Sequence, residues 1–257
     1  MTASRRRLLQ GFAAAGAAAW LAACDRLVAN PTVKQGLAMA EGLTRRAQRL
    51  VVDRNALAPE YAASEISPDF RGNGTINPSD PEYRALAAAG FADWRLVIDG
   101  LVERPLSLSL AELRGEPART QITRHDCVEG WSAIGQWTGA KLGPLLDKAG
   151  LKPQARYIVF HCADTFDPFA PKGLGRYYES LDLIDARHPQ TILAYEMNGQ
   201  PLSVKHGAPC RLRVERQLGY KHAKYLMRIE AVADLAGIGG GKGGFWEDRG
   251  YEWYAGI

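Results

Sequence analysis

One cysteine stands in a part of the sequence that is rich in charged residues. Cys127 follows the cationic residues Arg124 and His125. Residues 118–124 favour a β-strand that ends shortly before it. Cationic neighbours lower the pKa of a thiol and so favour the thiolate, which is the form that binds metals. A lone cysteine is also commonly a small buried apolar residue, so this segment alone leaves both interpretations open.

The chain contains four cysteines, and the other three bear on the role of Cys127. Cys162 and Cys210 could form a disulfide in an oxidising compartment, where cysteines commonly pair. Cys24 lies in the N-terminal segment, outside the region expected to fold. Cys127 would then remain as a single unpaired thiol, which suggests a chemical rather than a structural role.

Histidine and cysteine residues also offer a different chemistry. The residues whose types could bind zinc or serve a cysteine hydrolase are His125, Cys127, His161 and Cys162. Structural zinc sites normally draw on two close pairs of ligands, and the sequence has no Cys-x-x-Cys pair. This alternative is therefore the weaker one, and a metal analysis of the purified protein would test it.

Hydrophobic patterns of period two, bounded by turn residues, predict the strands that must position these residues. The predicted strands cover residues 94–100, 106–108, 118–124, 157–160, 191–197, 200–204, 210–216 and 223–233. Asn198-Gly199 predicts a tight hairpin turn between two of them. Arg211 alternates with apolar residues along its strand, so we expect it on a polar strand face.

Helices are expected to be short, apart from one near the N-terminus. Residues 33–52 carry apolar residues at helical spacing and favour an amphipathic spacer helix. Residues 142–149 favour a helix that Gly150 ends, and Ser109 and Ser180 are candidate caps of two further helices. Strands and short helices mix without regular alternation, which predicts the α+β class with mainly antiparallel sheets.

The N-terminus has the layout of an export signal. A run of arginines at residues 5–7 precedes the apolar run 11–23, which is too short to span a bilayer. Paired arginines at this place indicate the twin-arginine export machinery, which carries folded proteins. Residues 21–24 resemble a bacterial lipobox, in which Cys24 would be lipidated and anchored to the inner membrane. Simple cleavage at residues 17–19 is the alternative.

The expected organisation follows from these segments. We predict a signal peptide with a lipobox at residues 1–23, a spacer helix within residues 24–58 and a periplasmic catalytic domain at residues 59–257. The 32 basic and 28 acidic residues give a charge of +4, and removal of three signal arginines leaves 29 basic residues and a charge of +1. A nearly neutral mature protein has no electrostatic support for binding nucleic acid.

Several motifs in a fixed order resemble the sulfite oxidase-like molybdopterin-binding domain, over about residues 65–257. The motifs are Arg124-x-x-Cys127-Val128-Glu129-x-Trp131-Ser132, Trp137-x-Gly139, Asn198-Gly199-x-Pro201-Leu202, Gly207-Ala208-Pro209-x-Arg211 and Gly219-Tyr220-Lys221-His222-Ala223-Lys224. Several ordered motifs are far more specific than any one of them. Within the superfamily, Cys-Val-Glu-x-Trp-Ser is most similar to the periplasmic methionine-sulfoxide reductase catalytic subunits.

The resemblance implies a molybdenum–molybdopterin cofactor and the residues that hold it. Cys127 would be the catalytic thiolate ligand, and a soft ligand suits a metal that also binds the dithiolene sulfurs of the pterin. The residues implied to contact the cofactor are Asn73, Cys162, His206, Arg211, His222, Ala223 and Lys224. Asn77 is an alternative register for Asn73, and Cys162 stands where the reductases usually carry a threonine.

The resemblance also implies a sulfite oxidase-type molybdopterin-binding fold and a two-electron oxo transfer. The expected reaction reduces a small or protein-bound sulfoxide, or a related N-oxide, with electrons from a membrane haem b subunit or cytochrome. The alternatives are a sulfite-oxidising dehydrogenase and a lipoprotein that binds without catalysis. Sulfite is a dianion, and Val128, Glu129 and Gly130 after the cysteine offer it no cation.

The C-terminus combines a glycine-rich stretch, residues 237–244, with an aromatic stretch, residues 245–254. The aromatic residues could lie over the mouth of the active site or form a docking surface. Aromatic residues at a chain end more commonly pack against the fold. We therefore assign this stretch no catalytic role.

Overall fold

The computed structural model describes residues 30–171 and 174–257, and the chain divides into two compact units, Met1–Val52 and Asp53–Ile257. The predicted twin-arginine signal and lipobox lie outside the described residues. The domain boundaries that we predict from the sequence, after residues 23 and 58, therefore stay predictions.

The described part of the first unit is one long helix, α2 (Pro31–Val51). Asn30 caps it, because its side-chain oxygen accepts a hydrogen bond from the Thr32 N–H at 2.9 Å. Pro31 occupies the first turn, where a helix needs no N–H. The helix predicted at residues 33–52 is thus confirmed. No helix among the described residues is both long enough and apolar enough to cross a bilayer.

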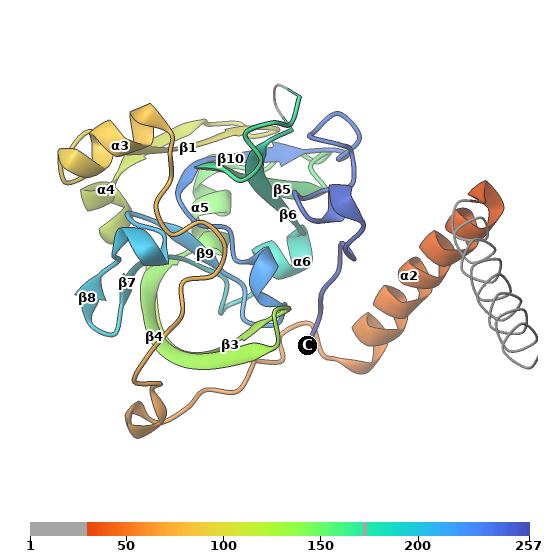
Figure 1. The fold of residues 1–257 in the computed structure, drawn as a ribbon, viewed down its shortest axis with the longest axis horizontal. Coiled ribbons are helices and arrows are strands. Elements are labelled where there is room, and N and C mark those ends of the chain that lie inside the picture. The colour runs from red at the N-terminus through yellow and green to blue at the C-terminus, as the bar shows by residue number, and fades with distance from the viewer. Residues whose placement is uncertain (1–29, 172–173) are drawn as a thin grey trace, which may run out of the picture. The chain divides into compact units, whose positions relative to one another are not determined.

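The second unit is built on two five-stranded β-sheets (Figure 1). The first contains, in spatial order, β2 (Leu106–Ser109), β1 (Arg95–Gly100), β10 (Leu226–Val232), β5 (Tyr157–Thr165) and β6 (Arg176–Asp182). The second contains β3 (Ala118–Cys127), β4 (Trp131–Lys141), β7 (Ile192–Met197) and β8 (Gln200–Pro201), with β9 (Arg211–Arg213) paired to β7. Among the described strands only β1 and β10 pair in parallel, which confirms the α+β class with mainly antiparallel sheets.

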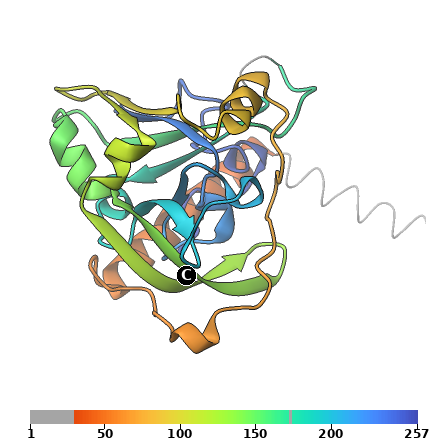
Figure 2. The same ribbon diagram turned by 90° about the vertical axis from the view of Figure 1, so that its left-hand side faces the viewer.

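Short helices connect the strands of this unit (Figure 2). They are α3 (Pro81–Ala88), α4 (Leu110–Arg114), α5 (Leu142–Ala149) and α6 (Leu183–Ala186), with 3-10 turns η1 (Ala63–Glu65), η2 (Val204–His206), η3 (Gly219–Lys221) and η4 (Glu247–Arg249). The capping box at Ser109 and the stop at Gly150, whose φ is 71°, are both confirmed. Helix α3 was not predicted, although Asp80 and Pro81 give it a regular start.

The predicted cap at Ser180 is wrong. Ser180 lies inside β6, opposite Val159 of β5, and its hydroxyl donates to the carbonyl of Gly243. Because β6 pairs with β5 as far as Asp182, the chain stays extended past Ser180. Asp182 is the cap instead, and its carboxylate accepts the N–H of Asp185 at 2.9 Å.

The strand predicted at residues 210–216 is shorter than expected and carries its charges inward. Only β9 pairs with β7, and both Arg211 and Arg213 are fully buried. The two guanidinium groups lie over the Trp137 ring, at 5.0 and 4.4 Å from its centroid. The polar face of this strand therefore points into the protein interior. Burying a cation there costs free energy unless a partner compensates its charge.

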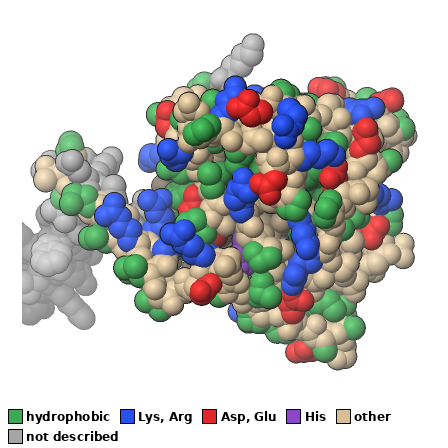
Figure 3. All heavy atoms as spheres, turned by 180° about the vertical axis from the view of Figure 1, so that it is seen from behind, with side chains coloured by type: hydrophobic (Ala, Val, Ile, Leu, Met, Phe, Trp, Pro, Cys, Tyr) green, Lys and Arg blue, Asp and Glu red, His purple; other side chains and the backbone are tan. Residues whose placement is uncertain are grey.

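The main hydrophobic core joins the first sheet to one face of the second. Leu96 and Phe160 of the first sheet, Leu193 of the second and Leu145 of α5 are all fully buried in it. Each such side chain contributes roughly 1.5–3 kcal/mol on burial. A smaller cluster around Trp137 covers the other face of the second sheet. Acidic and basic side chains are interspersed over the face of the molecule seen in Figure 3.

Candidate active site

The hairpin of β3 and β4 places Cys127 at its tip. The strands pair in an unbroken antiparallel register from Ala118 opposite Ala140 to Cys127 opposite Trp131. The N–H of Gly130 donates to the carbonyl of Cys127 at 3.0 Å and closes the turn. Gly130 has a φ of 83°, which a residue with a Cβ adopts only under strain. The local sequence therefore fixes the half-buried cysteine at the end of a long ribbon.

Burial raises the pKa of the Cys127 thiol. The backbone N–H groups of Glu129 and Val128 lower this pKa in part, and the carboxylate of Glu129 raises it. Arg124 does not lower it, because its guanidinium pairs with Asp126 at 2.9 Å. The prediction that cationic neighbours lower this pKa is therefore wrong. A bound metal cation is the agent that would favour the thiolate here.

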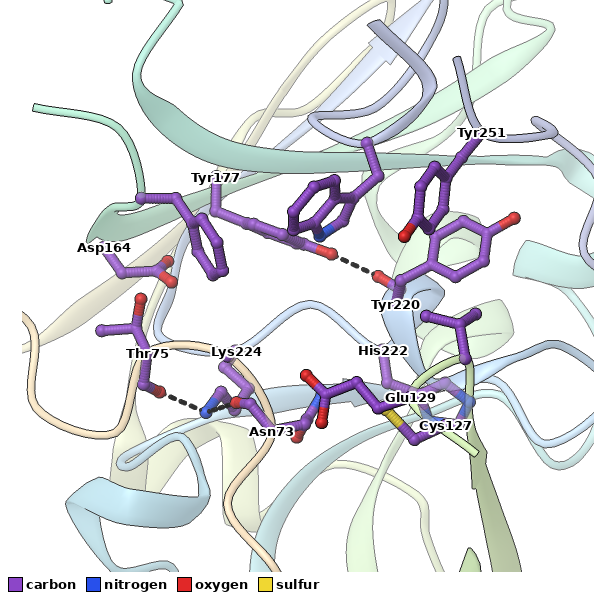
Figure 4. A pocket seen from close by; sticks show the side chains of 14 residues that line it. Asn73, Thr75, Cys127, Glu129, Asp164, Tyr177, Tyr220, His222, Lys224 and Tyr251 are labelled. Carbon is purple, nitrogen blue, oxygen red and sulfur yellow. Dashed lines mark hydrogen bonds between the residues drawn. The ribbon is translucent and has the colours of Figure 1, made fainter. Parts of the chain in front are cut away.

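Cys127 opens onto a pocket of about 150 Å³ (Figure 4). Four of the predicted site residues line it, namely Asn73, Cys127, His222 and Lys224. In Figure 4, Cys127 and His222 lie together at one end of the lower wall, and Asn73 and Lys224 lie farther along it. His206, Arg211, Cys162 and Ala223 do not line the pocket.

Arg211 lies buried against two of the predicted site histidines. Its guanidinium donates to the carbonyl of His206 at 3.1 Å and to that of His222 at 3.4 Å. Burial lowers the pKa of Arg211 to about 9, and the neighbouring Arg213 lowers it further. Arg213 pairs with Glu215 at 2.5 Å, whereas no carboxylate among the described residues pairs with Arg211. A buried cation without a counter-ion indicates an anionic ligand.

Lys224 joins the pocket to the loop that carries Asn73. Its ammonium donates to the carbonyls of Asn73 at 2.6 Å, of Thr75, and of Lys205 at 3.3 Å. Burial lowers the pKa of Lys224 to about 7, and Arg211 acts in the same direction. The loop that carries Asn73 is thus held at the pocket by Lys224, the cation that would meet an anionic ligand.

The residues present fit a molybdopterin cofactor. His206, Arg211 and His222 each keep one buried nitrogen without a hydrogen-bond partner among the described residues. Such an atom costs on the order of 1–3 kcal/mol when it stays unsatisfied. Burial also lowers the pKa of His206 to about 4, so this cluster disfavours its own positive charge. A pterin that bears a phosphate would satisfy the nitrogens and neutralise the cations.

Two predicted cofactor contacts have no polar atom available to the pocket. The Cys162 thiol is buried and meets the carbonyl of Phe160 at 4.0 Å. The N–H of Ala223 donates to the carbonyl of Lys221 at 3.1 Å, and its carbonyl accepts the N–H of Leu212 at 2.8 Å. Their roles as cofactor contacts gain no support from this geometry and stay predictions.

Cys162 and Cys210 do not form the disulfide considered from the sequence, because both are free thiols. Leu226 of β10 lies between them: it pairs with Cys162 on one side, and its N–H donates to the carbonyl of Cys210 at 3.0 Å on the other. Two strand spacings of about 4.8 Å separate the cysteines. The Cα atoms in a disulfide lie within about 7 Å. The pairing is therefore geometrically excluded in this fold.

Asp164 is a pocket residue that the sequence analysis missed. It lies in β5, it is buried, and one carboxylate oxygen has no hydrogen-bond partner among the described residues. Burial raises its pKa to about 6, while Lys224 and Thr75 act to lower it. The signal in the sequence was a single acidic residue inside a strand that otherwise reads as buried.

One side of the pocket is aromatic, and part of it comes from the C-terminus. The aromatic residues that line the pocket are Phe166, Tyr177, Tyr220, Trp246 and Tyr251, and Figure 4 shows the three tyrosines on the side opposite Cys127. The Tyr177 hydroxyl donates to the carbonyl of Tyr220 at 2.5 Å. The interpretation of the C-terminal aromatic residues as packing alone is therefore incomplete, since Trp246 and Tyr251 reach the site.

The four residues of the zinc alternative do not come together. His161 meets Glu230 at 2.9 Å and stands next to Cys162 in β5, so the two side chains point to opposite faces of the sheet. His125 is buried beside Arg213, with its Nδ1 at 3.0 Å from the guanidinium. In the described part of the chain, no three His, Cys, Asp or Glu side chains are arranged to hold a metal ion.

Comparison with known families identifies a molybdopterin-binding domain in this chain. Residues 84–236 match the oxidoreductase molybdopterin binding domain. The matched span is more than half of the chain and contains Cys127 and every predicted cofactor contact except Asn73.

Known relatives extend the likeness to nearly the whole chain. A provisionally named protein-methionine-sulfoxide reductase subunit, YedZ1, of Azospira oryzae is 36% identical over 253 residues, which cover 98% of this chain and 88% of that protein. The protein-methionine-sulfoxide reductase catalytic subunit MsrP of Xanthomonas campestris is 34% identical over 247 residues, which cover 90% of this chain and 70% of that protein. The solved structure of the sulfane dehydrogenase SoxCD of Paracoccus pantotrophus is 25% identical with a TM-score of 0.49, and the match covers 56% of this chain and 39% of the SoxCD chain.

The family match and the donor set at the pocket therefore lead to the same assignment. Cys127 lies at a hairpin tip inside the span matched by the family, and so do the three residues with unsatisfied buried nitrogens, His206, Arg211 and His222. The chain belongs to the oxidoreductase molybdopterin binding domain family, within the sulfite oxidase superfamily, and is a molybdenum–molybdopterin oxidoreductase.

Proposed function

We propose that this enzyme reduces the sulfoxide of oxidised methionine residues in proteins to the thioether. The observation that carries the proposal is 36% identity to a methionine-sulfoxide reductase subunit over 98% of the chain. The MsrP relative bears the name of the same reaction. In the overall reaction the sulfoxide S–O bond breaks, two electrons and two protons are consumed, and the oxygen leaves as water.

The chemistry of the pocket favours a neutral substrate over an anion. Glu129 places a carboxylate beside Cys127, and aromatic side chains form the opposite wall. Sulfur and methyl groups pack favourably on aromatic rings, at roughly 0.3–1.5 kcal/mol for each sulfur contact. Sulfite is a dianion and would need cations beside Cys127, where Glu129 instead supplies a carboxylate. Sulfite oxidation is therefore the weaker alternative.

The residues of the site divide into a metal ligand and a cradle for the cofactor. Cys127 would bind molybdenum through its thiolate. Arg211, His206 and Lys224 would hold the phosphate end of the cofactor, and His222 would meet the pterin with the ring nitrogen that has no partner among the described residues. When bound, the molybdenum–molybdopterin group supplies two-electron oxygen-atom transfer.

The cellular setting is also part of the proposal. An exported enzyme anchored through lipidated Cys24 would meet oxidised proteins in the periplasm and take electrons from a membrane haem b subunit or cytochrome. The arginine run at residues 5–7 and the lipobox at residues 21–24 support export and anchoring. The relatives are named as subunits, which supports a partner that delivers electrons. Helix α2 would then separate the anchor from the catalytic unit.

Assays on the loaded enzyme test the substrate. Protein from a host with ample molybdate should reduce methionine sulfoxide in peptides when a reduced dye supplies the electrons, and should not oxidise sulfite when an oxidised dye is present to accept electrons. Cys127→Ala is the matched control and should turn over neither substrate. Sulfite oxidation without sulfoxide reduction would overturn the substrate assignment, and zinc without molybdenum in the wild-type protein would overturn the cofactor assignment.

A further inference from the structure

The last residues of the chain, 243–257, form a segment that we call the C-terminal strap. The strap lies beyond residues 84–236, which match the family. It nevertheless contributes Trp246 and Tyr251 to the pocket that contains Cys127. The strap therefore shapes the pocket from outside the span that the family model matches.

A buried ionic cluster fastens the strap to the first sheet. The Lys221 ammonium bonds to Glu179 of β6 at 2.5 Å and to Glu247 of the strap, and all three side chains are at most 1% exposed. The two carboxyl groups crowd Gly244, where no space remains for a Cβ. Burial raises the pKa of Glu179, and the neighbouring Glu247 raises it further. The Lys221 ammonium acts on this pKa in the opposite direction and offsets part of the cost of burying the carboxyl groups.

Hydrogen bonds fasten the strap on both sides of this cluster. The Ser180 hydroxyl donates to the carbonyl of Gly243 and accepts the Trp253 indole N–H at 2.8 Å. The N–H of Leu218 donates to the carbonyl of Ala255 at 2.9 Å. The strap is therefore held at its beginning, at its middle and near its end.

Between these anchors the strap presents a rigid aromatic surface to the pocket. Trp246 and Tyr251 stack with ring centroids 5.2 Å apart and planes at 28°. Phe166 packs edge-on against Trp246 at 5.4 Å, and Tyr220 packs edge-on against Tyr251 at 5.3 Å. Tyr251 remains 41% exposed, so the stacked pair extends from the pocket to the protein surface.

The charges of the strap face away from this surface. Its charged residues are Glu247, Asp248, Arg249 and Glu252, and none of them lines the pocket. The Arg249 guanidinium lies 3.7 Å from the centroid of the Phe245 ring and pairs with Asp167 at 3.4 Å. The Asp248 carboxylate accepts the Tyr178 hydroxyl at 2.6 Å. The strap therefore offers the pocket an uncharged aromatic face.

We propose that Trp246 and Tyr251 determine specificity by receiving the uncharged methionine-sulfoxide side chain of the substrate. This inference rests on the proposed reduction of methionine sulfoxide. The methyl and methylene groups of that side chain can lie on the ring faces while its S–O oxygen points toward the Cys127 side of the pocket. Lys221, Glu179 and Glu247 act as positioning residues, because they hold the strap and touch neither substrate nor cofactor.

Kinetics on loaded full-length enzyme test the recognition surface. Trp246→Ala and Tyr251→Ala should each raise KM for a methionine-sulfoxide peptide about tenfold, which corresponds to the loss of a modest apolar contact. The value of kcat should change less than about threefold, because uniform binding is lost rather than a contact made only in the transition state. Dimethyl sulfoxide, which lacks the longer side chain, should be affected far less. Phe169→Ala is the matched control, since Phe169 is 95% exposed and does not line the pocket.

The outcomes separate the two levels of the proposal. If the wild-type enzyme reduces the peptide, and the wall variants Trp246→Ala and Tyr251→Ala keep the KM of the Phe169→Ala control, the specificity role is wrong. The proposed reduction of methionine sulfoxide then still stands. If the wild-type enzyme reduces no sulfoxide, the proposed function fails and the inference fails with it. Molybdenum content must match wild type in both wall variants, and a loss of metal would overturn the assignment to substrate recognition.

The anchor is tested by Glu247→Gln, which keeps the shape of the side chain and removes its charge. We expect the same rise in KM for the peptide, with kcat for dimethyl sulfoxide and molybdenum content unchanged. A fall in kcat for both substrates at constant KM would show a general structural role and overturn the positioning role. If this variant does not fold, Trp253→Phe removes the indole hydrogen bond to Ser180 while keeping an aromatic ring, and it tests the same point.

Discussion

At the residue scale, Cys127 tests the metal assignment directly. We expect Cys127→Ser to lose molybdenum and to lower turnover at least about a hundredfold, because a hard hydroxyl replaces the soft ligand. The free energy of unfolding should change by less than about 1 kcal/mol, since the side chain is only half-buried. Metal analysis, the dye assay and thermal unfolding measure these effects.

Val128→Ala is the matched control, because it changes the exposed neighbour of Cys127 and should keep the metal. A Cys127→Ser variant with full molybdenum content and full turnover would refute the assignment of Cys127 as the metal ligand.

The pH dependence of unfolding tests the burial of Lys224 in cofactor-free protein. Its pKa in the fold is lowered to about 7 from 10.5, so the ammonium is disfavoured there. Between these pH values the unfolded chain binds the additional proton, and the free energy of unfolding therefore rises as the pH increases from about 7 toward 10. Lys224→Met should flatten this rise, by on the order of 1.4 kcal/mol for each pKa unit of the shift.

Denaturant titrations at pH 7 and about pH 10 measure that slope. Lys205→Met is the matched control, because Lys205 is exposed and should leave the slope unchanged. Arg211, whose pKa is lowered to about 9, acts in the same direction at higher pH and remains in both variants. Identical slopes in wild type and Lys224→Met would contradict the burial of the ammonium.

At the element scale, the β3–β4 hairpin tip can be tested with two matched glycines. Gly130 and Gly199 both have positive φ, 83° and 73°, and a Cβ at either would meet no atom within 4 Å. Gly130→Ala and Gly199→Ala should each therefore cost about 1 kcal/mol of stability through backbone strain alone. Only Gly130→Ala should also lower molybdenum content, because its turn carries Cys127. Thermal unfolding and metal analysis check this, and equal metal loss in both variants would contradict it.

Elements with a local signal could be predicted from the sequence, and those set by distant contacts could not. The Asn198-Gly199 turn and the helix end at Gly150 need residues with positive φ. Glycine and asparagine adopt positive φ more readily than other residues, so the sequence itself marks both positions. Ser180 misled the prediction because pairing with β5 keeps the chain extended beyond a good capping residue. The length and inward charge of β9 depend on Trp137, far away in the sequence.

The residues of the candidate site also divide into those with a signal in the sequence and those whose roles depend on distant contacts. Motif resemblance placed Asn73, Cys127, His222 and Lys224, which the fold brings to one pocket. Asp164 and the aromatic wall were missed because their roles depend on burial and on the return of the C-terminal strap. The thiol pKa of Cys127 was misjudged for a related reason, since Arg124, its neighbour in the sequence, pairs with Asp126 in the fold.

At the scale of the whole molecule, export and anchoring are the predictions to test. Replacement of the arginines at residues 5–7 by lysine should hold the loaded enzyme in the cytoplasm, because the twin-arginine route requires the arginine pair. Cys24→Ser should release the enzyme from membranes into the soluble periplasmic fraction, because one lipid-bearing residue provides the anchor. Cell fractionation and mass spectrometry of the N-terminus measure both effects. Wild-type protein found only in the cytoplasm would refute the export route.

The pocket draws its walls from residues as far apart along the chain as Asn73 and Tyr251. No partial chain emerging during synthesis can therefore enclose the pterin, and a protein truncated before its last residues would lack one side of the enclosure. The pterin can therefore be fully enclosed only after synthesis has passed Tyr251, late in the chain.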